Sequence, residues 1–217
     1  MNADPLPLQV IDLGLMAYRE AWARQVEAHE AVLAGGVPTL FLVEHPPVIT
    51  FGRRGATPGH LLASAPRLAG MGVDVVESDR GGDVTFHGPG QIVAYPILRL
   101  NDHRYSVGAY VHALERRVID TLRQFGIVAY TDRTAVGVWT DRDKRPEKIC
   151  AIGVRVRRGV SMHGIALNVE TNLAYFDLIV PCGIAERGVT SVRKVLGDKA
   201  PTIDVVRSVL AQNLLTL

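Results

Sequence analysis

The 217-residue sequence predicts an α+β fold, with a mixed or antiparallel sheet flanked by helices. Short strand-like runs cluster with few helices between them, whereas a doubly wound fold alternates strands and helices. Hydrophobic residues make up 47% of the chain, which is enough for a sizeable core. No break in composition marks a boundary, so residues 1–217 are predicted to form a single domain.

Elements in the first part of the chain follow from hydrophobic periodicity. Residues 15–33 carry apolar side chains at helical spacing, and Gly35 and Gly36 end the helix. Residues 52–72 are rich in Arg, Gly and Pro and predict a long loop with one helical turn. Short apolar runs predict strands at residues 8–13, 39–43, 48–51 and 73–77.

The middle and end of the chain alternate strands with two further helices. Residues 84–86 and 92–95 flank a glycine-rich turn and predict a hairpin-like pair. Helices are predicted from Ser106 to Phe125 and from Thr202 to Leu215, each with a side chain that can cap its first turn. The remaining predicted strands are residues 127–130, 136–139, 148–156 and 162–169.

Composition excludes several classes of protein. The formal charge is only +2 and no basic run is interleaved with aromatic residues, so no nucleic-acid partner is expected. The N-terminus has no secretory pattern, and the apolar tracts are too short for a membrane span. Two cysteines cannot make a disulfide framework in a chain of this size, so we expect a reduced, cytoplasmic protein.

Cys182 is a candidate nucleophile because of its neighbours. Pro181 stiffens the backbone before it, and Gly183 leaves space beside the sulfur. The alternative is a buried cysteine that packs as a small hydrophobe, as most free cysteines do. This stretch alone leaves both interpretations open.

Lys148 begins a predicted strand whose alternation is informative. One face carries Lys148, Cys150, Ile152 and Val154, and its apolar character predicts that it points at the core. An inward lysine loses solvation, so its pKa falls and it becomes a candidate base. The alternative is a frayed strand end with Lys148 in solvent. Cys150 lies on the same predicted face and is a rival nucleophile, although a core position is simpler.

The segment from Arg80 to Gln91 has the highest density of glycines. Such a loop lets backbone N–H groups approach a ligand closely, and its polar side chains favour a binding site over a pair of plain turns. It is neither a Walker loop nor a dinucleotide fingerprint. His163 and Asn168 do not favour a Cys-His-Asn triad, because five positions separate them on one strand. No His or Cys pair has ligand spacing, so no metal site is expected.

Five segments, taken in order, give the chain a family resemblance. It resembles the bacterial octanoyltransferases, also called the lipoate–protein ligase B family, from about Leu8 to the end. The segments that carry the resemblance are residues 42–53, 79–91, 148–154, 163–168 and 180–184.

The resemblance implies an α+β fold related to the biotin and lipoate protein ligases. It also implies transfer of an octanoyl group from acyl carrier protein to a lysine of lipoyl domains, such as those of 2-oxoacid dehydrogenases and the glycine cleavage H protein. This is the first step of lipoate assembly, by a monomer without a cofactor. Cys182 and Lys148 match the catalytic pair, and an acyl-Cys182 thioester is the expected intermediate. The implied pocket residues are Arg80, Gly81, Gly82, Asp83, Val84, Thr85, Phe86, His87, Ala151, Ile152, Gly153, Gly164, Ile165 and Ala166.

Two rival functions remain at this point. An ATP-dependent lipoate or biotin ligase on the same fold would need no cysteine nucleophile. A non-catalytic acyl-binding protein would bind the octanoyl carrier without turnover, and an inward Lys148 would serve no purpose there.

Overall fold

A large mixed sheet forms the centre of the computed structural model, which describes residues 7–54, 59–142, 145–180 and 187–217. The order across the sheet is β1 (Gln9–Leu15), β2 (Thr39–Glu44), β6 (Gln91–Ile97), β10 (Val160–Asn168), β9 (Arg145–Arg157), β8 (Ala135–Arg142) and β7 (Tyr130–Asp132). Strands β1 and β2 run parallel, and each later pair of neighbours in this order is antiparallel. A short strand, β11 (Gly188–Val189), pairs in parallel with β9. The predicted α+β class with a mixed sheet is therefore confirmed.

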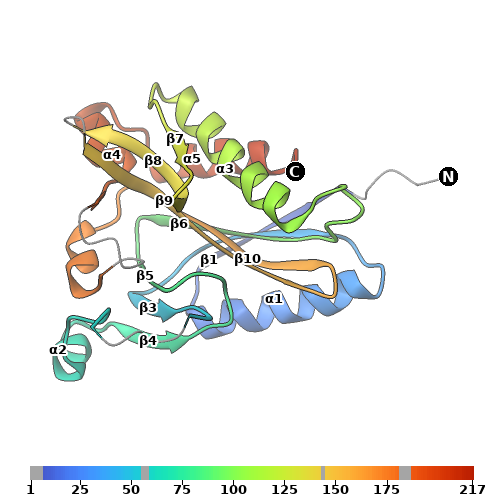
Figure 1. Ribbon diagram of the computed structural model, residues 1–217, viewed down its shortest axis with the longest axis horizontal. Helices are drawn as coiled ribbons and strands as arrows, with labels where there is room; N and C mark the ends of the chain where they lie inside the picture. Colours follow the sequence, from blue (N-terminus) through green and yellow to red (C-terminus); the bar gives the residue numbers. More distant parts are fainter. Residues whose placement is uncertain (1–6, 55–58, 143–144, 181–186) are drawn as a thin grey trace.

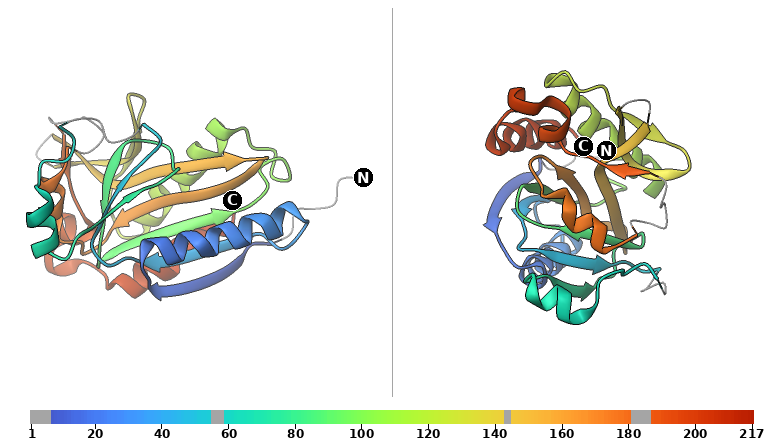
Figure 2. Two further views of the ribbon diagram at one scale, coloured as in Figure 1. Left: turned by 90° about the horizontal axis from the view of Figure 1, so that it is seen from below. Right: turned by 90° about the vertical axis from the view of Figure 1, so that its left-hand side faces the viewer.

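Helices cover both faces of this sheet (Figures 1 and 2). On one face α1 (Tyr18–Leu33) buries Ala21 and Val32 against β2, β6 and β10. On the other face α3 (Val107–Gln124) and α5 (Ile203–Leu214) pack over the main core. Helix α3 has the apolar stripe that its sequence predicts, and Ser106 accepts a hydrogen bond from the Ala109 N–H at 3.2 Å. Helix α5 begins after Thr202 as predicted, but the Thr202 side chain makes no capping bond.

A smaller sheet lies beside one end of the large one (Figure 1). Its strands are β4 (Asp74–Glu77), β3 (Val48–Phe51) and β5 (Val84–His87), with β3 in the middle. Helix α2 (Ala65–Gly70) and the 3-10 helix Leu173–Leu178 complete its core.

The predicted hairpin between residues 84–86 and 92–95 is wrong. Strand β5 pairs with β3 in the small sheet, whereas β6 pairs with β2 and β10 in the large one. The glycine-rich turn therefore carries the chain from one sheet to the other. Gly90 allows this because its φ is +80°, and a side chain there would lie 2.7 Å from the Glu170 backbone.

Strand β9 departs from the regular alternation predicted for it. Cys150 lies opposite Val138 on β8, but Lys148 lies opposite Trp139, so Ile149 is an extra residue in the ladder. Because Val138 and Trp139 are neighbours on β8, Lys148 and Cys150 do not share one face as predicted. The predicted strand at 127–130 is also mostly loop, since β7 begins at Tyr130.

The end of the chain contains two short elements that the sequence did not predict. These are α4 (Val192–Leu196) and the 3-10 turn Gly197–Lys199, which lead into α5. Within the described parts of the chain, none of the helices combines the length and apolar character that crossing a bilayer requires.

Candidate active site

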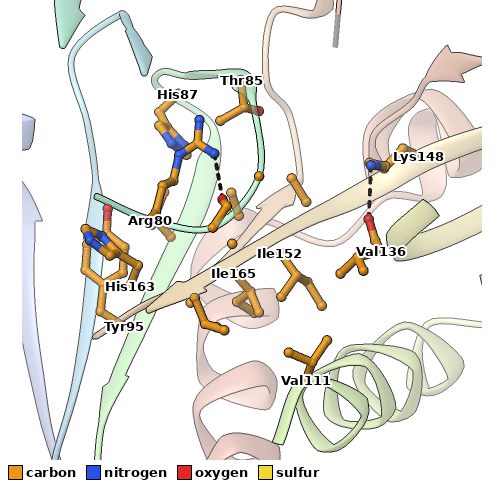
Figure 3. A pocket seen from close by; sticks show the side chains of 18 of the residues that line it. Arg80, Thr85, His87, Tyr95, Val111, Val136, Lys148, Ile152, His163 and Ile165 are labelled. Carbon is orange, nitrogen blue, oxygen red and sulfur yellow. Dashed lines mark hydrogen bonds between the residues drawn. The ribbon is translucent and has the colours of Figure 1, made fainter. Parts of the chain in front are cut away.

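A cavity of about 310 Å³ lies where the two sheets meet, against strands β9 and β10 and helix α3 (Figure 3). This volume is at the lower end of the range of about 300–1,000 Å³ that small-molecule pockets occupy. Lys148 and Val136 lie at one end, and a group of buried polar side chains lies at the other. Of the predicted pocket residues, those that line it are Arg80, Gly81, Gly82, Thr85, His87, Ala151, Ile152, Gly153, Gly164, Ile165 and Ala166.

Two glycines bring the glycine-rich loop against strand β9. The Gly81 N–H donates to the Val154 carbonyl at 2.9 Å. A side chain on Gly81 would meet that carbonyl oxygen at 2.9 Å, and one on Gly153 would meet the Gly81 oxygen at 2.8 Å. These glycines thus permit two backbones to touch, and the contact forms one wall of the cavity.

Arg80 holds the loop to strand β3 and is almost fully buried. Its guanidinium donates to the Thr50 carbonyl at 2.6 Å and to the Asp83 carbonyl at 2.7 Å. Two further bonds reach the Thr50 hydroxyl. The Arg80 guanidinium therefore fixes the loop and strand β3 relative to each other at the polar end of the cavity.

Neutral histidines surround this arginine. His87 Nδ1 donates to Gln91 Oε1 at 2.8 Å, and burial, together with the nearby charge of Arg80, lowers its pKa well below the usual value. Burial lowers the pKa of His45 to about 4, although Nδ1 donates to the Met16 carbonyl at 2.7 Å. The ring of Tyr18 stacks on His87 with 5.9 Å between centroids.

A chain of amide hydrogen bonds leads from this end toward Lys148. Gln91 Nε2 donates to Asn168 Oδ1 at 2.8 Å, and Asn168 Nδ2 donates to the Thr190 carbonyl at 3.0 Å. Thr190 in turn donates its N–H to the Lys148 carbonyl at 3.0 Å. The sequence showed Asn168 only as a doubtful triad member, whereas the structure shows it as a buried link between strands.

His163 lies at the cavity wall and pairs with an acid. Its Nε2 is 2.7 Å from Asp79 Oδ1, and Arg155 pairs with the other oxygen of Asp79. Burial lowers the pKa of His163 to about 3, with Arg80 and Arg155 adding to the effect. His163 is thus a buried residue of the cavity wall whose Nε2 is engaged by Asp79.

The remaining wall is apolar and is shared between the sheet and α3. Ile152 and Ile165 project from β9 and β10 toward Val111 on α3 (Figure 3). This wall suits a hydrocarbon chain, because each buried methylene contributes about 0.8 kcal/mol. Val111 belongs to the apolar stripe of α3 that packs on the sheet. That stripe is the signal from which the sequence could have predicted Val111 as a cavity residue.

Lys148 is half-buried at the other end of the cavity. Its Nζ donates to the Val136 carbonyl at 3.1 Å and lies 4.7 Å from the centre of the Trp139 ring. Val189 of β11 pairs with Lys148 across the sheet edge. The lysine therefore lines the cavity, although it does not share a face with Cys150 as predicted.

Other predicted residues lie elsewhere. Asp83, Val84 and Phe86 do not line the cavity. Val84 and Phe86 alternate with Thr85 along β5 and pack in the core of the small sheet, while Asp83 bonds His60 at 2.5 Å. Cys182 lies outside the described residues. The cavity residues that sequence reasoning missed are Tyr18, Arg54, Val93, Tyr95, Val111, Thr134, Ala135, Val136 and Val154.

Cys150 and metal binding are both poorly supported by the geometry. Cys150 is fully buried, and burial raises the pKa of its thiol to about 12, which disfavours the nucleophilic thiolate. Among the residues that the structure describes, no three His, Cys, Asp or Glu side chains are grouped so that they could hold a metal ion.

Comparisons with known proteins agree with this geometry. Residues 17–215 match the model of the lipoyl protein ligase A/B catalytic domain. An octanoyltransferase of Chloroflexus aurantiacus is 48% identical over 208 residues, covering 94% of this chain and 92% of that protein. An octanoyltransferase of Nitratidesulfovibrio vulgaris is 42% identical over 207 residues, covering 95% of this chain and 93% of that protein.

Solved structures show the same fold at low identity. A bipartite lipoate protein ligase from Thermoplasma acidophilum gives a TM-score of 0.74 at 18% identity, over 96% of this chain and 82% of that one. A biotin protein ligase from Aquifex aeolicus gives 0.54 at 12% identity, over 95% and 68%. The fold relation to both ligase groups is therefore confirmed. The chain belongs to the lipoyl protein ligase A/B catalytic-domain family and, within it, to the octanoyltransferases, which are acyltransferases.

Proposed function

We propose that the protein moves an octanoyl group from acyl carrier protein to the lysine of a lipoyl domain, through a thioester on Cys182. The observation that carries this proposal is the pairing of an apolar cavity with Lys148 at its end. Val189, which lies seven positions after Cys182 in the sequence, pairs with Lys148 between strands β11 and β9. The reaction takes place in the cytoplasm, where thiols stay reduced, within a single catalytic domain of a monomer.

The first half-reaction loads the enzyme. The Lys148 amine takes the proton of the Cys182 thiol, and the thiolate attacks the carbonyl carbon of the octanoyl thioester. The bond from that carbon to the carrier's sulfur breaks, and the Lys148 ammonium returns the proton to the departing thiolate. The thioester is already activated, so the step needs no nucleotide.

The second half-reaction unloads it. The acceptor lysine amine attacks the acyl-Cys182 carbonyl, and Lys148 accepts a proton from the attacking nitrogen. The carbon–sulfur bond breaks as the amide forms, and Cys182 leaves as a thiolate that regains the proton. The octanoyl chain meanwhile lies along Val111, Ile152 and Ile165, with Arg80, Gly81, Gly82, Thr85, His87, Ala151, Gly153, Gly164 and Ala166 forming the rest of the wall.

Intact-mass analysis tests the assignment of the two residues. After mixing with octanoyl carrier protein, the Cys150→Ala variant should gain one octanoyl group, and Cys182→Ala should gain none. Lys148→Ala should fold and lose most of the transfer rate. An adduct lost only with Cys150→Ala, or ATP-dependent transfer without any adduct, would overturn the proposal in favour of a ligase mechanism.

A further inference from the structure

A buried carboxylate lies on α3 close to the lysine end of the cavity. Glu115 is only 2% exposed, and its neighbours on the same face of the helix, Leu114 and Val118, are apolar. Its Oε1 accepts the Gly137 N–H at 3.2 Å, and its Oε2 is 2.9 Å from Nδ1 of the exposed His112. Burying a carboxylate costs free energy, so the Gly137 N–H that Glu115 binds is expected to matter to the protein.

The N–H that Glu115 binds belongs to a peptide unit that Lys148 binds as well. The peptide between Val136 and Gly137 presents its N–H to Glu115 and its carbonyl oxygen to Lys148 Nζ, at 3.2 Å and 3.1 Å. In a planar trans peptide these two groups point in opposite directions. Glu115 and Lys148 therefore lie at the two ends of one amide dipole.

This arrangement transmits charge as well as position. A carboxylate that accepts the N–H polarises the amide and makes the carbonyl oxygen a stronger acceptor. The strengthened carbonyl favours the ammonium form of Lys148 and fixes the direction of its Nζ. Removing the negative charge at the far end should therefore lower the pKa of Lys148 without changing its direct contacts.

The start of strand β8 is shaped for this contact. Gly137 has a φ of +133°, and a side chain there would lie 2.8 Å from the Cys150 carbonyl and 3.2 Å from Lys148 Cε. The Trp139 indole N–H donates to the Ala135 carbonyl at 3.0 Å, which ties the ring that lies beside Nζ to the same part of the strand. Glu115 thus adds a second contact to a strand segment that already touches the lysine.

We propose that Glu115 is a positioning residue that acts on Lys148 through the Val136–Gly137 peptide. This inference rests on the proposed role of Lys148 in transfer. It adds a residue from α3 to the machinery at the pocket end, and it predicts that a neutral substitution will change the chemistry of the lysine.

Trace acetylation of the full chain with acetic anhydride, followed by peptide mass spectrometry, tests this directly. Glu115→Gln keeps an acceptor for the Gly137 N–H and removes the charge, while its amide nitrogen takes the place of the oxygen that faces the exposed His112. Relative to the exposed Lys199 in the same sample, Lys148 should label at least about threefold faster at a fixed pH, with its labelling midpoint moved to lower pH. An unchanged ratio and midpoint would overturn the proposal.

Kinetic measurements supply a second readout. Glu115→Ala should lower kcat for octanoyl transfer by between about tenfold and a hundredfold, with KM for the donor nearly constant, because the lysine is misplaced rather than the acyl chain. His112→Ala, which leaves the Gly137 bond intact, should keep kcat near that of the unsubstituted protein. Equal losses in both variants would contradict the proposal.

The controls separate this inference from the proposed function. Should Lys148→Ala transfer octanoyl groups at the normal rate, the role of Lys148 fails, whereas the labelling result still reports whether Glu115 acts on the lysine. Should Lys148→Ala be inactive and Glu115→Gln label normally, only the inference about Glu115 fails. If Glu115→Ala does not fold, as judged by its melting temperature, the Glu115→Gln labelling decides.

Discussion

His45 shows how burial of one side chain links stability to pH. Its Nδ1–H donates to the Met16 carbonyl and its Nε2 accepts from the Tyr95 hydroxyl at 2.9 Å, so the neutral ring is fully used. The pKa of about 4 in the folded protein lies below the value of about 6.5 for an unfolded histidine. Between these values the unfolded chain binds a proton that the folded chain does not.

Stability should therefore be lost as pH falls from about 6.5 to about 4, by about 3 kcal/mol for His45. His87 and His163 add to the loss in the same direction, because burial lowers their pKa values too. The His45→Asn variant, whose amide can still donate to Met16, should show a shallower decline. Urea unfolding at a series of pH values measures it, and an unchanged slope in the variant would contradict the assignment.

Individual residues could be predicted where their environment is local. The glycine-rich loop indicated a pocket wall, and Gly81 and Gly82 do line the cavity. Lys148 lines it as well, although the regular alternation from which its inward direction was predicted is broken at Ile149. The same alternation placed Cys150 beside Lys148 and failed, because the bulge at Ile149 depends on pairing with β8. Glu115 gave no signal in the sequence, since its partner is a backbone N–H on a distant strand.

The caps of α3 and α5 offer a matched comparison between elements. Both helices begin after a hydroxyl residue, but only Ser106 accepts a capping bond. Ser106→Ala should lower the free energy of unfolding by about 1 kcal/mol, and Thr202→Ala by clearly less. Chemical denaturation of both variants measures the difference; equal losses would show that the Ser106 bond is not what stabilises the first turn of α3.

Whole elements could be predicted when their signal was periodic and long. Helix α3 was predicted almost to its last residue, because its apolar stripe, cap and terminal glycine all lie within its own sequence. The β5–β6 hairpin was predicted wrongly, because a strand's partner is set by long-range packing that no local pattern reveals. Strand β11 is too short to carry any pattern, although it places Val189 beside Lys148.

At the scale of the molecule, one wall of the cavity forms where the glycine-rich loop before β5 touches strand β9 of the large sheet. The class of fold followed from composition and from the clustering of strands, but the division into two sheets did not, since it depends on how β3 and β5 pair. The loop contacts strand β9 at Gly81 and Gly153, where neither backbone segment leaves room for a side chain. This wall of the cavity therefore depends on how the small sheet and the large sheet are placed together.

Substituting Gly81 tests this dependence. Gly81→Ala places a methyl group 2.9 Å from the Val154 carbonyl oxygen, so the loop must move away from β9. We expect kcat/KM for octanoyl transfer to fall about tenfold and stability to fall by about 1–3 kcal/mol. The control is Gly108→Ala on α3, where a methyl group meets nothing within 4 Å and should leave transfer unchanged while raising stability by up to about 1 kcal/mol. Normal transfer by Gly81→Ala would mean that the wall does not need the two sheets to touch there, and the acyl chain would then have to lie nearer α3.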